Sequence, residues 1–159
     1  MEDTGTIITN REKDASSHTV TINAGNDKVE VTLDNVNIKA DSGSALTSKG
    51  DVTLTLKGDN HLTGGISDNG NYGLSGISSS GSLTISGGET DSLTAQGGSG
   101  ANGIYSSGSV TISGGSTVTA NGGNGTISGG NGIYSDSGDV TISGGSTVTA
   151  KGGDRTTAG

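Results

Sequence analysis

Cysteine, proline, tryptophan and phenylalanine are all absent from this chain of 159 residues, and its only aromatic residues are three tyrosines. Without cysteine, neither a disulfide framework nor a thiolate metal site can form. Basic residues are also few, eight against sixteen acidic ones, and a surface with so little positive charge does not suit nucleic-acid phosphates. No apolar run approaches the roughly 18 residues of a membrane-spanning helix, so we expect no insertion into a membrane.

Large apolar side chains are scarce as well. Leu, Ile and Val together supply 29 residues, which is less than a doubly wound α/β enzyme or a compact helical bundle needs for its core. So small an apolar fraction can indicate disorder, but disordered chains usually carry a high charge as well. Here only 15% of the residues are charged, whereas glycine alone supplies 32.

The second half of the chain is repetitive. Residues 109–120 match residues 139–150 at every position except the first. Three segments share one pattern, and they are GSLTISGG (81–88), GSVTISGG (108–115) and GDVTISGG (138–145). The distance between the copies varies, which places insertions in the turns and excludes a repeat of fixed length.

Within each copy, polar and apolar residues alternate with the period of two that is typical of β-strands. Gly-Gly, Gly-Asn or Ser-Gly pairs end the segments, and glycine permits the positive φ that tight turns need. No segment shows the 3.6-residue period of a helix. The sequence therefore predicts an all-β chain: a parallel β-helix (β-solenoid) of about five coils, with three short strands per coil and little or no helix.

Stacked coils predict that equivalent inward positions are apolar in every coil, about 4.8 Å apart. Four such ladders can be aligned: Val31, Val52, Leu83, Val110 and Val140; Leu33, Leu54, Ile85, Ile112 and Ile142; Val36, Leu62, Leu93, Val118 and Val148; and Leu46, Ile77, Ile104 and Ile133. We expect residues 1–18 to form an N-terminal strand or cap, residues 19–150 the solenoid, and residues 151–159 an incomplete coil or a tail. Ile7 and Ile8 are expected to cover the N-terminal end. An uncapped coil recruits other strands, so end-to-end self-association is also expected.

Outward positions align too. Threonine forms two predicted rows, which are Thr53, Thr84, Thr111 and Thr141, and Thr63, Thr94, Thr119 and Thr149. Threonine has good strand propensity, so one interpretation of these rows is structural. The other interpretation is a hydroxyl array that binds sugar hydroxyls, with Thr119 and Thr149 as ligand-binding residues. An ice-binding surface is less well supported, because His61 and Ser92 interrupt the neighbouring row.

Tyr105 and Tyr134 occupy the same position in consecutive repeats, each next to an inward isoleucine. We expect both rings to point outward and to stack on each other. Exposed aromatic faces suit the apolar faces of sugar rings, so one interpretation is that the tyrosine pair binds a glycan. The other is that the two rings only pack over the junction beneath the longer glycine-rich loops. Tyr72 has a similar Asn-Tyr-Gly context and is expected to join the pair.

Acidic side chains form a calcium site only if they converge with carbonyl oxygens. The candidate ligands are Asp59, Asp68 and Asn69 in the longest coil, although acidic residues in turns also serve solubility and Asx-turns. No carboxylate pair recurs on one face, and His18 and His61 are isolated. The acid–base groups of a polysaccharide-degrading enzyme are therefore missing. We expect no catalytic residues, and calcium is the one candidate cofactor.

The run HTVTINAGNDKVEVTLDNVNIKADSGSALTSKGDVTLTLKGDNHLTGG (18–65), followed by SVTISGGSTVTANGG units, resembles the carbohydrate-binding β-helix domains of bacterial secreted and cell-surface proteins. The resemblance implies a right-handed helix, export, and binding of an acidic or neutral polysaccharide, in some members with calcium. It assigns no individual binding residue. We therefore expect a non-catalytic module of a larger extracellular or cell-surface protein that binds a polysaccharide or cell-surface glycan. The alternative is a structural stalk or spacer, and an enzyme is less well supported.

Overall fold

The structure is a computed structural model that describes residues 5–157, and this part of the chain contains β-strands and no helix. The strands are β1 (Thr6–Thr9), β2 (Val20–Asp34), β3 (Asn37–Lys39), β4 (Leu46–Lys57), β5 (Asp59–Thr63), β6 (Ile77–Ser79), β7 (Leu83–Ser86), β8 (Ser92–Gln96), β9 (Ile104–Ser106), β10 (Val110–Ser113), β11 (Thr117–Asn121), β12 (Ile133–Ser135), β13 (Val140–Ile142) and β14 (Thr147–Lys151). The all-β prediction is confirmed.

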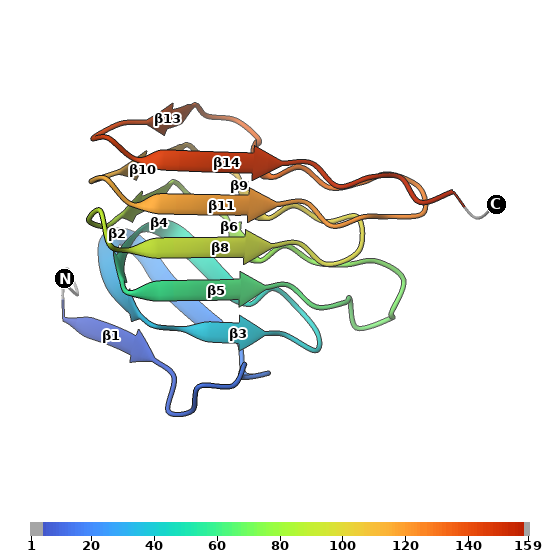
Figure 1. Cartoon of the computed structure of the whole chain (residues 1–159), viewed down its shortest axis with the longest axis horizontal. Helices are drawn as coiled ribbons and strands as arrows, with labels where there is room; N and C mark the ends of the chain where they lie inside the picture. Colours follow the sequence, from blue (N-terminus) through green and yellow to red (C-terminus); the bar gives the residue numbers. More distant parts are fainter. Residues whose placement is uncertain (1–4, 158–159) are drawn as a thin grey trace.

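The strands form two parallel sheets that wind around one axis (Figure 1). Sheet B has the order β14-β11-β8-β5-β3, and the larger sheet A contains all other strands. Sheet A covers two faces, because β2 and β4 each run along both, and in later coils each long strand is replaced by two short ones. The five coils are β2–β3, β4–β5, β6–β8, β9–β11 and β12–β14. In Figure 1 the strands of sheet B run left to right in front, the chain returns behind them, and each coil lies above the last, so the solenoid is right-handed as predicted.

The inward side chains of sheet A form stacked ladders, but the first coil is aligned differently from the prediction. The ladder that begins at Leu46 is confirmed from the second coil to the fifth. Val52 pairs with Val29 instead of Val31, and Val31 pairs with Leu54. The predicted partners of the first coil are therefore wrong by two residues. A slip of two residues keeps every side chain on its own face, so alternation alone could not distinguish the two registers.

Sheet B shows a shift of the same size. The prediction placed Leu62 opposite Leu93, whereas Leu62 pairs with Ala95 and Leu93 pairs with Asn60. Val118 and Val148 stack on Leu93 as predicted. Val36 was predicted opposite Leu62, but Leu62 pairs with Ile38. The search for apolar inward positions passed over Asn60 because its side chain is polar.

Asn60 is fully buried among these apolar residues. Its Oδ1 accepts a hydrogen bond from the Val36 N–H at 2.8 Å, and its Nδ2 donates to the carbonyls of Lys57 and Ser92 at 3.3 Å each. The amide therefore bonds to the coils on both sides of its own, which satisfies its buried polar atoms.

The N-terminal end is covered only in part. β1 pairs with the second half of β2, so Ile8 packs against the core while Ile7 is 63% exposed. The prediction that both isoleucines cover the end is confirmed for Ile8 and wrong for Ile7. Residues 1–4 of the predicted cap lie outside the described residues.

At the other end, coil 5 exposes inward positions. Val140 and Ile142 are 45% and 50% exposed, whereas Val110 and Ile112, their equivalents in coil 4, are fully buried. The chain continues from β14 into a parallel bridge between Arg155 and the preceding coil. The described part of the predicted segment 151–159 therefore pairs with the preceding coil, and residues 158–159 lie outside the described range.

Glycine-rich segments follow the strands of sheet B and project beyond the solenoid (Figure 1). We call segments 64–76, 97–103, 122–132 and 152–157 the glycine extension. Hydrogen bonds link them in two directions: the Gly123 N–H donates to the carbonyl of Ala101 in the preceding coil at 2.8 Å, and the Gly130 N–H donates to the Gly123 carbonyl at 2.9 Å. A Cβ on Gly123 would collide with the backbone of the preceding coil. Glycine is required here by close approach of the backbones.

Candidate functional site

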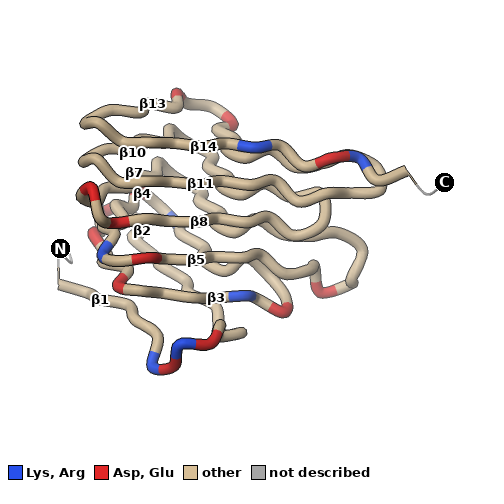
Figure 2. The backbone as a smooth tube through the Cα atoms, viewed as in Figure 1, with Lys and Arg blue, Asp and Glu red and all other residues tan. Residues whose placement is uncertain are grey.

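The outer face of sheet B carries polar side chains in three rows. Strand pairing aligns Asp59, Ser92, Thr117 and Thr147; His61, Thr94, Thr119 and Thr149; and Thr63, Gln96, Asn121 and Lys151. We call this surface the polar face. β8 and β11 carry no charged residue, so the middle of the polar face is uncharged (Figure 2). With coils about 4.8 Å apart, it is a regular array of hydroxyl and amide groups.

The register of sheet B changes one of the two predicted threonine rows. His61 stands opposite Thr94, in the place predicted for Thr63, because the pairing of β5 with β8 is shifted by two residues. The other predicted row, from Thr53 to Thr141, is confirmed on the outside of sheet A.

Asp59 joins two side chains at the N-terminal end of the polar face. The Ser92 hydroxyl donates a hydrogen bond to Asp59 Oδ1 at 2.5 Å, and His61 Nε2 lies 2.9 Å from Asp59 Oδ2. The Ser92 hydrogen bond, and after it the His61 contact, hold the pKa of Asp59 below its ordinary value of 3.8. Asp59 is therefore a carboxylate at neutral pH.

The order of contacts in this cluster differs from that of an activated serine nucleophile. A serine nucleophile needs a base, usually histidine, that accepts its proton directly. Ser92 instead donates to Asp59, which stands between Ser92 and His61. A carboxylate fixed by two neighbours is a well-oriented acceptor for the hydroxyl groups of a ligand.

Asn35 positions the start of β5 and hence Asp59. It is the one non-glycine residue in the described chain with a positive φ, 52°, a conformation that asparagine tolerates better than most residues. Its Oδ1 accepts a hydrogen bond from the Asp59 N–H at 3.2 Å, and its Nδ2 donates to the Asp34 carboxylate at 2.7 Å.

A polar cleft of about 340 Å³ adjoins this cluster. One wall is segment 10–13, and the other is formed by the corner at Asn35 and by β3 and β5. Asn10 fixes the segment to β3, because its Nδ2 donates to the Asn37 carbonyl at 2.7 Å and its Oδ1 accepts from the Asn37 N–H at 3.0 Å. The cleft extends the polar face beyond β5 and brings Arg11 and Lys13 to its edge.

Tyr105 and Tyr134 project from β9 and β12 of sheet A, in register. Their ring centroids are 5.8 Å apart and their planes differ by 10°, which confirms the predicted stacking. Ser78 is the neighbour of Tyr105 on the other side. Because the two rings cover part of each other, they do not form one flat platform, and Tyr134, which is 40% exposed, offers the more open ring.

The predicted ligand-binding residues do not share one face. Tyr105 and Tyr134 lie on sheet A, whereas Thr119 and Thr149 lie on sheet B. Tyr72 is 58% exposed in the glycine extension, and within the described residues no ring contact joins it to the tyrosine pair. The tyrosine pair, Tyr72 and the threonine rows therefore lie on separate surfaces.

The three candidate calcium ligands are also apart. Asp59 begins β5, whereas Asp68 and Asn69 follow the other end of that strand, in the glycine extension. Asn69 Oδ1 accepts hydrogen bonds from the Ser67 hydroxyl at 2.6 Å and the Asn71 N–H at 3.2 Å, which is an Asx-turn. Among the described residues, no three His, Asp or Glu side chains are grouped in a way that could hold a metal ion.

Sequence reasoning missed the cluster around Asp59 and the polar cleft. The spacing of Asp59 and His61 does place both on one side of a strand, and this signal could have been used. The contribution of Ser92 depends on the register between coils, which the alternation of polar and apolar residues does not determine. The cleft depends on segment 10–13 folding back against β3, which no sequence pattern indicates.

In the described part of the chain, the structure has no long apolar helix that could cross a bilayer. Comparison of the chain with protein-family models, with curated proteins and with solved structures gives no match.

Proposed function

We propose that this domain is a non-catalytic polysaccharide-binding module that acts outside the cell or on a bacterial surface. The observation that carries the proposal is the register of the polar face, which repeats hydrogen-bonding groups from coil to coil. A polysaccharide repeats its hydroxyl groups along its length in the same manner. Each neutral hydrogen bond contributes only about 0.5–1.5 kcal/mol, so binding would depend on several coils together.

The polar face and the polar cleft offer complementary groups to such a ligand. Threonine hydroxyls, such as those of Thr94 and Thr119, both donate and accept hydrogen bonds. Asp59 accepts hydrogen bonds from sugar hydroxyls, while Arg11 and Lys13 at the cleft supply donors. The order of contacts around Asp59 supports a binding role, because Asp59 stands between Ser92 and the imidazole of His61.

A glycan array with the purified chain identifies a ligand, and calorimetry then compares variants. The double variant Thr117→Val and Thr119→Val removes two hydroxyls from β11 but keeps the side-chain shape. We expect its affinity to fall about fivefold or more, from two lost hydrogen bonds. Thr84→Val with Thr111→Val is the matched control, because it removes two outward hydroxyls from sheet A. Equal losses in both variants, or no loss in the first, would contradict the proposed surface.

The tyrosine pair is tested separately. Replacing Tyr105 and Tyr134 with alanine removes the aromatic rings of sheet A and leaves the polar face intact. We expect the affinity for the glycan to stay within about twofold, because no contact with the polar face is lost. Loss of binding in this variant alone would move the site to the tyrosine pair.

A structural spacer is the second candidate function. The outward row from Thr53 to Thr141 on sheet A shows that hydroxyl side chains are not confined to one face, as expected where threonine only serves a solvated strand. A spacer would bind no glycan on the array, even at millimolar sugar.

A further inference from the structure

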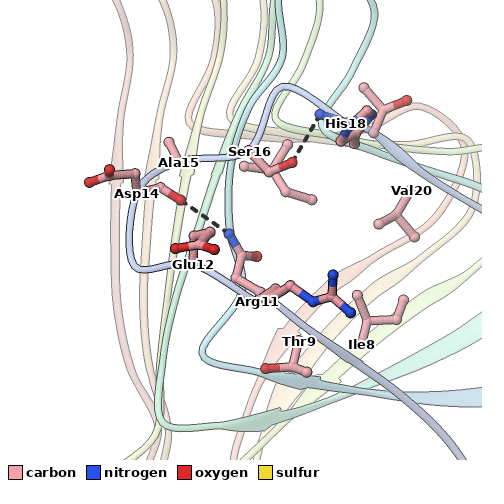
Figure 3. A pocket seen from close by; sticks show the side chains of 12 residues that line it. Ile8, Thr9, Arg11, Glu12, Asp14, Ala15, Ser16, His18 and Val20 are labelled. Atoms are coloured by element: carbon pink, nitrogen blue, oxygen red, sulfur yellow. Dashed lines mark hydrogen bonds between the residues drawn. The ribbon is translucent and has the colours of Figure 1, made fainter.

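A cavity of about 530 Å³ lies at the N-terminal end of the solenoid, between the segment that follows β1 and the first coil (Figure 3). Its size is within the range of roughly 300–1,000 Å³ that is usual for small-molecule sites. It is distinct from the polar cleft, which opens on the other side of segment 10–13.

The floor of the cavity is the outermost layer of the hydrophobic core at the N-terminal end of the solenoid. Ile8, Val20 and Ile38 line it, and each stands in register with an inward residue of the next strand. β1 pairs only with the second half of β2, so it does not close this layer. The cavity therefore offers an apolar surface to a ligand.

The wall of the cavity is anchored at both ends. Asn10 is bonded to Asn37 at one end, and at the other the Ser16 N–H donates to the Asn37 carbonyl at 2.9 Å. The Lys39 N–H donates in turn to the Ser16 carbonyl at 2.9 Å. These bonds hold the intervening segment over the floor without a ligand, so the cavity is preformed.

Arg11 supplies a positive charge inside this wall. No side chain of the described residues forms an ion pair or hydrogen bond with its guanidinium. Figure 3 shows Arg11 directed toward Ile8 and Val20, whereas the side chains of Glu12 and Asp14, which also line the cavity, are directed away from these two residues. A free guanidinium beside an apolar floor is suited to a carboxylate, which it binds through two parallel hydrogen bonds.

We propose that this cavity binds a molecule with an apolar body and one carboxylate group, of the class of medium-chain alkanoates. The apolar chain covers Ile8, Val20 and Ile38, and the carboxylate pairs with Arg11. The two proposals share Arg11, which also lines the polar cleft. The apolar contacts with Ile8, Val20 and Ile38 belong to this cavity alone and do not involve the polar face.

The test is a titration of the full chain with decanoate below its micelle concentration, followed by methyl NMR. We expect saturable shifts at the methyl groups of Ile8, Val20 and Ile38. Arg11→Gln should weaken decanoate binding about tenfold or more, because a charge-assisted pair is lost. Lys13→Gln is the matched control: it removes a neighbouring charge that does not line this cavity, and its affinity should stay within about twofold.

Ala15→Trp, a change at an exposed residue of the wall, fills the cavity and should abolish binding while the spectrum keeps its folded dispersion. Four results would overturn the proposal. They are no saturable shift with wild type, shifts at Val140 and Ile142 instead of the floor, equal affinity for wild type and Arg11→Gln, and decylamine binding as tightly as decanoate.

Discussion

Replacing Asn60 with alanine tests whether a buried amide joins the coils. The Asn60 side chain accepts from the Val36 N–H and donates to the carbonyls of Lys57 and Ser92. Truncation leaves the buried Val36 N–H without a partner, which costs about 1–3 kcal/mol. The Lys57 carbonyl keeps a hydrogen bond from the Asn35 N–H at 3.0 Å, so it adds less. With the lost packing, the free energy of unfolding should fall by about 2–4 kcal/mol.

Urea unfolding followed by circular dichroism measures this change. Asn121→Ala is the matched control, because it removes the same amide from an outward position of β11 and should cost less than about 0.5 kcal/mol. Asn60→Leu introduces the residue type found at Leu93 in the next coil. Its buried side chain returns about 1.5–3 kcal/mol, so it should be more stable than Asn60→Ala, although the Val36 N–H still has no acceptor. If Asn60→Ala were as stable as wild type, the Val36 N–H would have another partner and the reasoning would be refuted.

Three further predictions concern other parts of the molecule. Gly123→Ala sets a Cβ against the preceding coil and should lower the free energy of unfolding by about 2 kcal/mol or more, whereas Gly152→Ala has room and should change it by less than about 0.5 kcal/mol in the same urea assay. The pKa of Asp59 is lowered in the folded state, so its stabilisation is present above the unfolded pKa near 3.8 and is lost as the pH falls through the folded value. Asp59→Asn should thus be less stable than wild type at about pH 6, and the difference should shrink as the pH falls below 3.8. A double-mutant cycle on Tyr105→Ala and Tyr134→Ala should give a coupling of about 0.5–1.5 kcal/mol, and a coupling near zero would show that the stacking adds nothing.

Much of the fold could be predicted because alternation and repetition act on every coil alike. Segments 109–120 and 139–150 differ only at their first residue and define one repeating unit. Their strands pair residue for residue in the structure. In the first two coils the strands are longer and offer three apolar positions in a row, such as Val29, Val31 and Leu33. Two registers then bury equally good side chains, and the choice between them depends on turns that no periodic pattern describes.

The candidate site was harder to predict for the same reason. The alignment of the rows on the polar face depends on the pairing of β5 with β8, in which the inward Asn60 stands opposite Leu93. The tyrosine stack was predictable because Tyr105 and Tyr134 stand in equivalent repeats. Their separation from Thr119 was not, since it requires knowing which sheet each strand of a coil joins.

The glycine extension should also set how the domain responds to temperature. Its segments associate mainly through amide and carbonyl groups, with few apolar side chains between them. Exposing apolar surface raises the heat capacity on unfolding, and exposing polar surface lowers it. The heat-capacity increment per residue should therefore be smaller than the usual value of about 12–15 cal/mol/K. A smaller increment broadens the curve of stability against temperature, which favours a folded state that resists cooling better than an ordinary globular domain of this length.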